Sequence, residues 1–330
     1  MTTPTSADDP ARELRRLVEA GRFREALAAH QSALDPAART RPEVELFAAT
    51  AATRLGEFTL ATSLAESALQ RFRARADGDG RMRAVNLLGA IAWEHGRLDD
   101  AERCFGEALE LARSLDDTLM AAHASNNLAS VAHLRNRPDL ALSLYRSALL
   151  AYQRLGDRRG TAQTYHNLGL VFRQMADWND AEGAALQAVR HAEQVGESSL
   201  IALTVMGRAE LSLDRGELDL ARRELERAVE LAAGANDEVG LAEAGRLSAA
   251  LAFKEGRLAA ALEQAQAARQ RAAALGVLQI QAECLAIEAL ALKRLGRLSE
   301  AQERQAGALA IFDRLGAEEL ASRFRRDWGS

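Results

Sequence analysis

The sequence predicts an all-α fold made of about eight helix-turn-helix repeats and a C-terminal helix. The first observation is a helical period: in residues 161–196, Tyr165, Leu168 and Phe172 recur at steps of three and four, and Trp178 begins a second such stripe. The second observation is that this pair of amphipathic stripes recurs along the chain. A single hairpin cannot bury both stripes, so each repeat needs neighbours stacked against it.

Small residues mark the length of the repeat. Turns between paired helices are predicted at Gly21, Gly56, Gly96, Asn136, Ala176, Gly216, Gly256 and Gly296. The first step is 35 residues (56 − 21) and each later step is 40 (for example 96 − 56). Alanine lies five residues after every turn, from Ala26 to Ala301, and twelve residues after every turn, from Ala33 to Ala308. Because alanine fills only 70 of 330 positions, sixteen hits at sixteen positions indicate true internal repetition.

The elements follow one another from the N-terminus. Residues 1–9 form a polar tail, predicted to be disordered, whose final aspartates are suited to cap a helix that begins at Pro10. The repeat array is expected over residues 10–316. Its first repeat runs to about Leu34, a short link occupies residues 35–41, and Pro42 can open the second repeat.

A last helix is predicted over residues 317–328. Leu320, Phe324 and Trp328 recur there at steps of four. We expect this helix to cap repeat eight by covering its apolar stripe, as terminal repeats require. The alternative is that Phe324 and Trp328 form an exposed anchor for a partner.

The repeats resemble a known family. A Leu-Gly pair, two aromatic residues and two spaced alanines carry the likeness in its best copy, at Leu168-Gly169, Phe172, Trp178, Ala181 and Ala188. This arrangement resembles the tetratricopeptide repeat. The step of 40 residues exceeds the roughly 34 of that family and is similar to the arrays of kinesin light chains. The last three repeats depart from the pattern, because the Leu-Gly pair becomes Arg208-Ala209, Ser248-Ala249 and Glu288-Ala289.

The resemblance implies a right-handed superhelical α-solenoid whose concave groove is lined by the first helix of each repeat. In repeats three to five the outward stripe of this helix is rich in amides and imidazoles. The candidate binding residues are Arg83, Asn86, Trp93, His123, Asn126, Asn127, Ser130, His133, Gln163, His166, Asn167 and Arg173.

Amide side chains both donate and accept hydrogen bonds, so we expect Asn127 and Asn167 to hold the main chain of an extended peptide. Arg83 and Arg173 are suited to select an acidic side chain or a carboxylate. The alternative is that all these polar residues only solvate an exposed helical face.

Three functions remain open. The first is a non-catalytic scaffold or adaptor that binds a protein or peptide in the groove formed by repeats three to six. The second is a peptide-responsive regulatory receptor, or the regulatory subunit of an effector, because solenoids flex between neighbouring repeats. The third is a structural scaffold that self-associates. The expected partner is a protein or an extended peptide.

Composition disfavours other classes of partner. The formal net charge is −5 and arginine alternates with Asp and Glu at helical spacing, so nucleic-acid binding is not expected. No apolar run reaches the roughly 18 residues of a membrane-spanning helix, and residues 1–10 do not resemble a signal peptide. We therefore expect a cytoplasmic protein without membrane contact. Cys104 and Cys284 lie on different repeats and are expected to be buried thiols.

Motifs for catalysis and for metals are absent from the sequence. No phosphate-binding, dinucleotide-binding or nucleophile-elbow pattern occurs. His123 and His133 lie ten residues apart, roughly 15 Å along a helix, and cannot hold one zinc ion together. Asp77 and Asp79 resemble the start of a calcium loop, but Arg81 replaces the third ligand, so a turn is expected. We expect no enzymatic activity, no cofactor and no metal.

Overall fold

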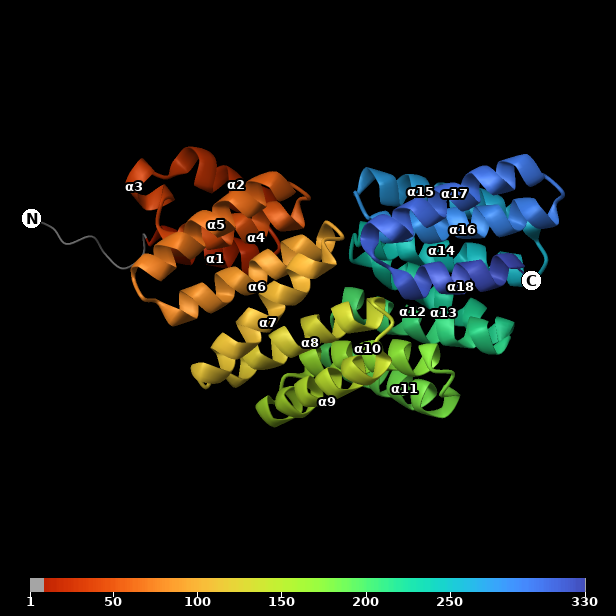
Figure 1. Ribbon diagram of the computed structural model, residues 1–330, viewed down its shortest axis with the longest axis horizontal. Helices are drawn as coiled ribbons and strands as arrows, with labels where there is room; N and C mark the ends of the chain where they lie inside the picture. Colours follow the sequence, from red (N-terminus) through yellow and green to blue (C-terminus); the bar gives the residue numbers. More distant parts are fainter. Residues whose placement is uncertain (1–8, 330) are drawn as a thin grey trace, which may run out of the picture. The chain divides into compact units, whose positions relative to one another are not determined.

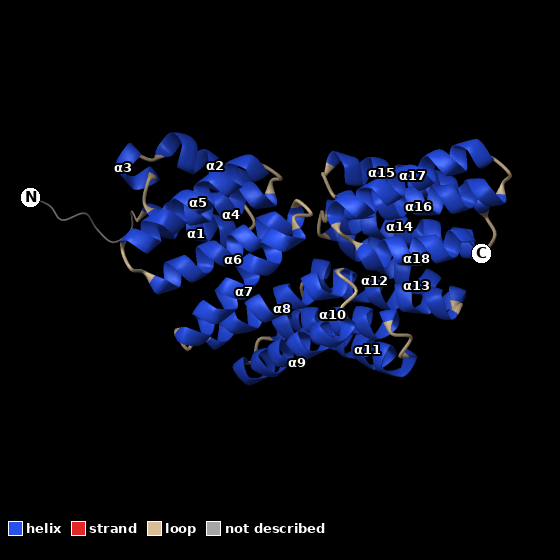
Figure 2. Cartoon of the chain, in the orientation of Figure 1, coloured by secondary structure: helices blue, strands red, loops and turns tan. Residues whose placement is uncertain are grey.

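The computed structural model describes residues 9–329, apart from the side chain of residue 33. All regular secondary structure in this range is helical (Figure 2). The predicted fold class, an all-α solenoid of eight helical hairpins followed by a C-terminal helix, is confirmed. The tail predicted for residues 1–9 lies, except for Asp9, outside the described residues.

Each hairpin pairs a first helix with a second helix (Figure 1). The first helices are α1 (Pro10–Glu19), α4 (Pro42–Arg54), α6 (Gly78–Glu94), α8 (Thr118–Leu134), α10 (Arg158–Gln174), α12 (Ser198–Arg215), α14 (Glu238–Lys254) and α16 (Leu278–Arg294). The second helices are α2 (Phe23–Ala28), α5 (Phe58–Ala74), α7 (Leu98–Ser114), α9 (Pro138–Leu155), α11 (Trp178–Val195), α13 (Leu218–Gly234), α15 (Leu258–Ala274) and α17 (Leu298–Leu315). The last helix is α18 (Glu318–Gly329).

The helices form two compact units, Met1–Asn127 and Leu128–Ser330, which we call unit 1 and unit 2. Unit 1 contains α1 to α7 and the part of α8 up to Asn127, and unit 2 contains the rest of α8 and α9 to α18. The boundary therefore falls within one continuous helix.

Residues with a left-handed backbone end the helices at regular intervals. All eight predicted turns have a positive φ, between 55° at Asn136 and 77° at Gly216 and Gly256. The turns between repeats lie midway, so from Gly56 to Gly316 a left-handed residue recurs every 20 residues (for example 76 − 56 = 20). The backbone amide after most of these residues caps the C-terminal end of the helix. After Gly56, for example, the N–H of residue 57 donates to the carbonyl oxygen of Ala52 at 2.9 Å. These residues set the lengths of the helices from α5 to α17.

Aspartates begin several first helices. Asp77, Asp117, Asp157 and Asp237 each accept, through Oδ1, the backbone N–H three residues later at 2.9 Å. This bond satisfies one of the free amides at a helix N-terminus. Asp77, compared above with a calcium loop, is therefore a helix cap. Asp9 also caps α1, as predicted, through the N–H of residue 11 at 3.4 Å.

The first repeat differs from the others in ways that the sequence analysis did not predict. After Phe23–Ala28 the second helix continues as a short π-helix, η1 (Ala29–Ala33). The link then contains a further helix, α3 (Pro36–Arg39), capped by Asp35, whose Oδ1 accepts two backbone amides at 2.9 Å. Such short helices carry no full apolar stripe, so periodicity cannot reveal them.

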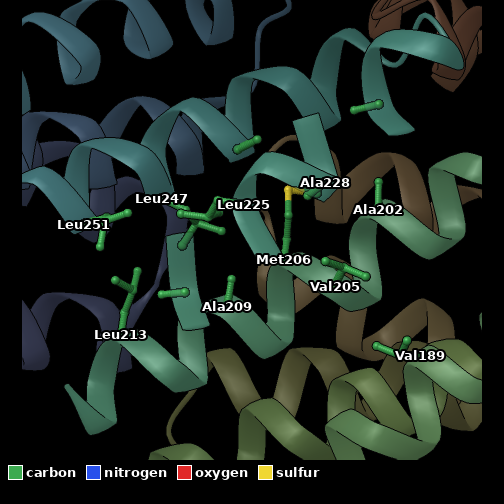
Figure 3. Close-up of a cluster of buried hydrophobic side chains, with 13 residues drawn as sticks. Val189, Ala202, Val205, Met206, Ala209, Leu213, Leu225, Ala228, Leu247 and Leu251 are labelled. Carbon is green, nitrogen blue, oxygen red and sulfur yellow. The ribbon is translucent and has the colours of Figure 1, made fainter. Parts of the chain in front are cut away.

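Alanine allows the paired helices to pack closely. The alanines five residues after each turn are fully buried: Ala26, Ala61, Ala101, Ala141, Ala181, Ala221, Ala261 and Ala301 are each 0% exposed. In unit 1, Leu27, Ala52 and Ile91 belong to one buried cluster. In unit 2, Met206 of α12 and Leu247 of α14 belong to another (Figure 3). The array is thus held by a chain of small cores rather than by one large core.

Ion pairs replace the leucine of the Leu-Gly pair in two of the last three repeats. Arg208 of α12 pairs with Glu224 of α13 at 3.1 Å. Glu288 of α16 is fully buried and pairs with Arg269 of α15 at 2.6 Å and with Arg304 of α17 at 3.0 Å. At these two positions, ion pairs between neighbouring helices take the place of apolar packing by leucine.

Helix α18 packs against repeat eight. Phe324 is buried, and its ring centroid lies 6.5 Å from that of Phe312 of α17 and 6.2 Å from that of Trp328. Lys293 of α16 contacts the ring of Trp328, with Nζ 5.2 Å from its centroid. The apolar stripe predicted for this helix therefore covers the end of the array.

Candidate functional site

The twelve candidate residues lie on three consecutive first helices, α6, α8 and α10, and they are divided between the two units. Unit 1 contains Arg83, Asn86, Trp93, His123, Asn126 and Asn127. Unit 2 contains Ser130, His133, Gln163, His166, Asn167 and Arg173. All of them except Arg83 are half-buried.

In unit 1, amides of adjacent helices meet. Asn127 of α8 donates from Nδ2 to Oδ1 of Asn86 on α6 at 3.4 Å. This distance is at the long end of the hydrogen-bond range, so the contact is weak. Arg83 is turned along its own helix, where Nε donates to Oδ2 of Asp79 at 2.9 Å. The amide pair therefore links two repeats through polar side chains.

In unit 2, the hydroxyl of Ser130 is engaged with a second helix. Its Oγ lies 2.8 Å from the phenolic oxygen of Tyr145 on α9, and Tyr145 is almost completely buried. Burial raises the pKa of Tyr145 well above its ordinary value. Ser130 thus stabilises the interior of repeat four.

His133 and His166 are uncharged at neutral pH. Burial lowers the pKa of both side chains to about 4, and the positive charge of Arg173 acts in the same direction. The ring of His166 lies against α12 at Gly207, where a Cβ would approach Nδ1 to 2.5 Å. Glycine is therefore needed at this position, and the pocket between α10 and α12 is lined by His166, Arg173 and Gly207, among other residues.

Arg173 belongs to a network of charged side chains on the first helices of unit 2. Its Nη1 lies 3.1 Å from Glu210 and 3.0 Å from Asp214, both on α12. Arg246 of α14 continues the network, since its guanidinium lies 3.3 Å from Glu210 and 2.9 Å from Glu283 of α16. Arg173 therefore already has two carboxylate partners, so fewer of its N–H groups remain to bind an acidic ligand.

The network controls the charge of Glu210. Burial alone would raise the pKa of this carboxyl, but Arg173, Arg246 and Arg323 hold it well below its ordinary value. Sequence reasoning named Arg173 but missed this network. The sequence contained one sign of the network. Glu243 and Glu283 lie 80 and 120 residues after Gln163, so the later repeats carry a carboxylate where repeat five carries an amide.

Among residues 9–329, no group of three or more His, Cys, Asp or Glu side chains is arranged to hold a metal ion. Cys104 and Cys284 are both buried and free, as predicted. In the same range of residues, no helix combines the length and the apolar character needed to cross a membrane.

Comparison with known proteins identifies the repeat. Residues 42–114 and 119–194 match the family model of the tetratricopeptide repeat. Both segments are tetratricopeptide repeats. These two segments contain the second to fifth tetratricopeptide repeats, including the α6, α8 and α10 helices that carry the candidate residues. No curated protein matches the sequence.

Solved structures share the fold of this chain. A Rap protein complexed with competence and sporulation factor is 17% identical, with a TM-score of 0.78 over 97% of this chain and 90% of that one. The Rap conjugation gene regulator of plasmid pLS20, in complex with the Phr* peptide, is 18% identical, with a TM-score of 0.67 over 87% and 76%. Aspartyl phosphate phosphatase F from Bacillus subtilis is 14% identical, with a TM-score of 0.57 over 99% and 94%.

Proposed function

We propose that this tetratricopeptide repeat protein is a non-catalytic scaffold or regulator that binds an extended segment of a protein or peptide on its first helices. Asn127 in unit 1 and Asn167 in unit 2 are the proposed main-chain contacts. The other candidate residues lie on the same three helices, α6, α8 and α10.

The observation that carries this proposal is the amide pair of unit 1. Asn86 and Asn127 are half-buried on adjacent first helices and share one long hydrogen bond of 3.4 Å. A peptide amide or carbonyl could replace that bond at small cost, because each Asn both donates and accepts. A polar face that only solvated the helices would not need two amides placed against each other.

Two structures with this fold are complexes with a ligand, and one of the two ligands is named as a peptide. One is described as a complex with competence and sporulation factor, and the other as a conjugation gene regulator in complex with a peptide. Both descriptions favour a protein that binds a partner over a self-assembling scaffold, and the second favours a peptide-responsive regulator.

A third structure of this fold is named a phosphatase. We nevertheless propose a non-catalytic role here. The sequence contains no nucleophile-elbow or phosphate-binding motif, and the hydroxyl of Ser130, the one hydroxyl among the candidates, lies 2.8 Å from the phenolic oxygen of Tyr145.

The test begins with capture of a ligand. The full-length chain is used as bait in an extract of its native cells, bound peptides are identified by cross-linking and mass spectrometry, and their affinity is then measured by calorimetry. We expect Asn127→Ala and Asn167→Ala each to weaken binding about tenfold, the effect of losing one or two hydrogen bonds to the main chain.

The matched control is Asn179→Ala. Asn179 is exposed on α11, a second helix, so its removal should leave the affinity unchanged. Circular dichroism verifies that each variant keeps its helices. If affinity is retained in both site variants, these amides only solvate the helices; if the bound molecule is another copy of the chain, the function is self-assembly.

A further inference from the structure

Helix α18 reaches first helices that lie far away in the sequence. Glu319 accepts a hydrogen bond from Nε2 of Gln174 on α10 at 3.2 Å, across 145 residues. Arg323 donates from Nη2 to Oδ1 of Asp214 on α12 at 2.9 Å, across 109 residues. All of these residues belong to unit 2. A helix that only closed repeat eight would need neither contact.

The two sides of α18 have different chemistry. Toward α16 and α17 it presents Ala321 and Phe324, which are buried in an apolar cluster. Toward α10 and α12 it presents Glu319 and Arg323, which make hydrogen bonds and ion pairs. The apolar side fixes the helix to the end of the array, and the polar side places it on the surface formed by α10 and α12.

Asp214 links α18 to the candidate site. Its Oδ2 lies 3.0 Å from Nη1 of Arg173, and its Oδ1 receives Arg323. Arg323 also lies 4.0 Å from Glu210. One carboxylate is thus shared between a candidate binding residue and the C-terminal helix.

On the first helices, the carboxylates of this network outnumber the guanidinium groups, so Arg323 of α18 adds a needed positive charge. The first helices contribute four carboxylates and two guanidinium groups to the network, from Glu210, Asp214, Glu243, Glu283, Arg173 and Arg246. Arg323 of α18 is the third guanidinium. If α18 left, Asp214 and Glu210 would keep an excess of negative charge in a partly buried place, which is costly unless another cation replaces Arg323.

We propose that α18 is a tethered occupant of the surface formed by α10 and α12, and that an arginine-bearing segment of a protein partner takes its place. Such a segment must supply a guanidinium to Asp214. It must also compete with a helix that is held at high effective concentration, because α18 follows directly after repeat eight. This inference rests on the proposed function only in that the partner is a protein segment.

The test needs no natural partner. The probe is a labelled synthetic peptide with the sequence of residues 317–329, added to the full-length chain. The variant Arg323→Ala weakens the internal competitor. We expect it to bind the peptide about fivefold more tightly than the wild type, the effect of one partly exposed ion pair. Amide hydrogen exchange within α18 should rise by about the same factor, and Arg323→Lys should restore most of the protection.

The matched control is Arg325→Ala. Arg325 is on the same helix, but its guanidinium lies 3.6 Å from the exposed Asp313, and both side chains are more than half exposed. This variant should match the wild type in both measurements. A second probe peptide, in which Gln replaces the arginine equivalent to Arg323, should bind more weakly to Arg323→Ala than the first.

Two results would overturn the proposal: equal exchange rates in α18 of all the proteins, or equal binding of the two peptides. Neither depends on Asn127 or Asn167. A failure of the peptide-capture experiment therefore leaves this test intact, and a failure here leaves the proposed main-chain contacts to be judged separately.

Discussion

Replacing Arg246 with leucine tests the charged network of unit 2. The side chain of Arg246 is 7% exposed, and it lies 2.5 Å from Glu243, 2.9 Å from Glu283 and 3.3 Å from Glu210. Removing one partner of a buried ion pair costs roughly 3–5 kcal/mol of unfolding free energy. Because Glu243 keeps 26% exposure and can be hydrated, we expect the lower end of this range, about 3 kcal/mol at neutral pH.

This loss should shrink as the pH falls. In the wild type the pKa of Glu210 is held low, so its contribution to stability is present above the unfolded pKa of about 4.3 and is lost as the pH falls toward the folded value. In the variant Glu210 and Glu283 lose the positive charge of Arg246, which lowers the pKa of both, so they take up protons at a higher pH. The second effect already acts at about pH 4.5, and the first adds to it below the unfolded pKa, so the two proteins differ less at about pH 4.5 than at neutral pH.

Urea unfolding followed by circular dichroism at the two pH values measures the difference. Repeat arrays can unfold in steps, so hydrogen exchange in α12 and α14 supplies the local free energy. The matched control is Arg297→Leu, which removes an exposed pair with Glu300 at 2.6 Å and should change little. A loss below about 1 kcal/mol, or an equal loss at both pH values, would refute the reasoning. A charged network shielded from water must show both a large loss of stability at neutral pH and a smaller loss at about pH 4.5.

Glycine changes test the turns and the contact between α10 and α12. Ala176→Gly should stabilise the fold by about 1 kcal/mol, because Ala176 has a φ of 58°, and Gly216→Ala, at a φ of 77°, should destabilise it by a similar amount. Shifts of Tm in the same direction for both would contradict the left-handed turns. Gly207→Ala should cost about 1–3 kcal/mol, because its Cβ would meet the ring of His166. In a His166→Ala background it should cost much less, and a double-mutant cycle with additive costs would exclude the ring as the obstacle.

The repeat positions could be predicted because the backbone conformation at the turns and in the helix contacts restricts which residues occur there. A left-handed turn favours glycine, and close helix packing favours alanine, so both residues recur at fixed steps. The turn at Ala176, which has no glycine, also lies in this register. By contrast, α3 (Pro36–Arg39) and η1 (Ala29–Ala33) escaped prediction, because a helix of four or five residues has no period to detect.

The candidate site was harder to predict than the fold. Repeat register could place Asn127 and Asn167 on equivalent first helices, 40 residues apart. It could not show which charges pair, because Arg and Glu occur at helical spacing along most of the chain. The contact between Arg323 and Asp214 could not be predicted for a further reason. Helix α18 lies outside the repeat pattern, and this contact arises only from tertiary packing.

The 20-residue interval between left-handed residues also determines how such a protein can change in length. Between Gly56 and Gly316, gain or loss of a 40-residue segment, wherever it starts, preserves the alternation of first and second helices and adds or removes one complete hairpin. Gain or loss of 20 residues would keep every helix intact but would exchange the roles of the two helix types beyond that point. Tandem duplication is therefore tolerated in whole repeats and penalised in halves.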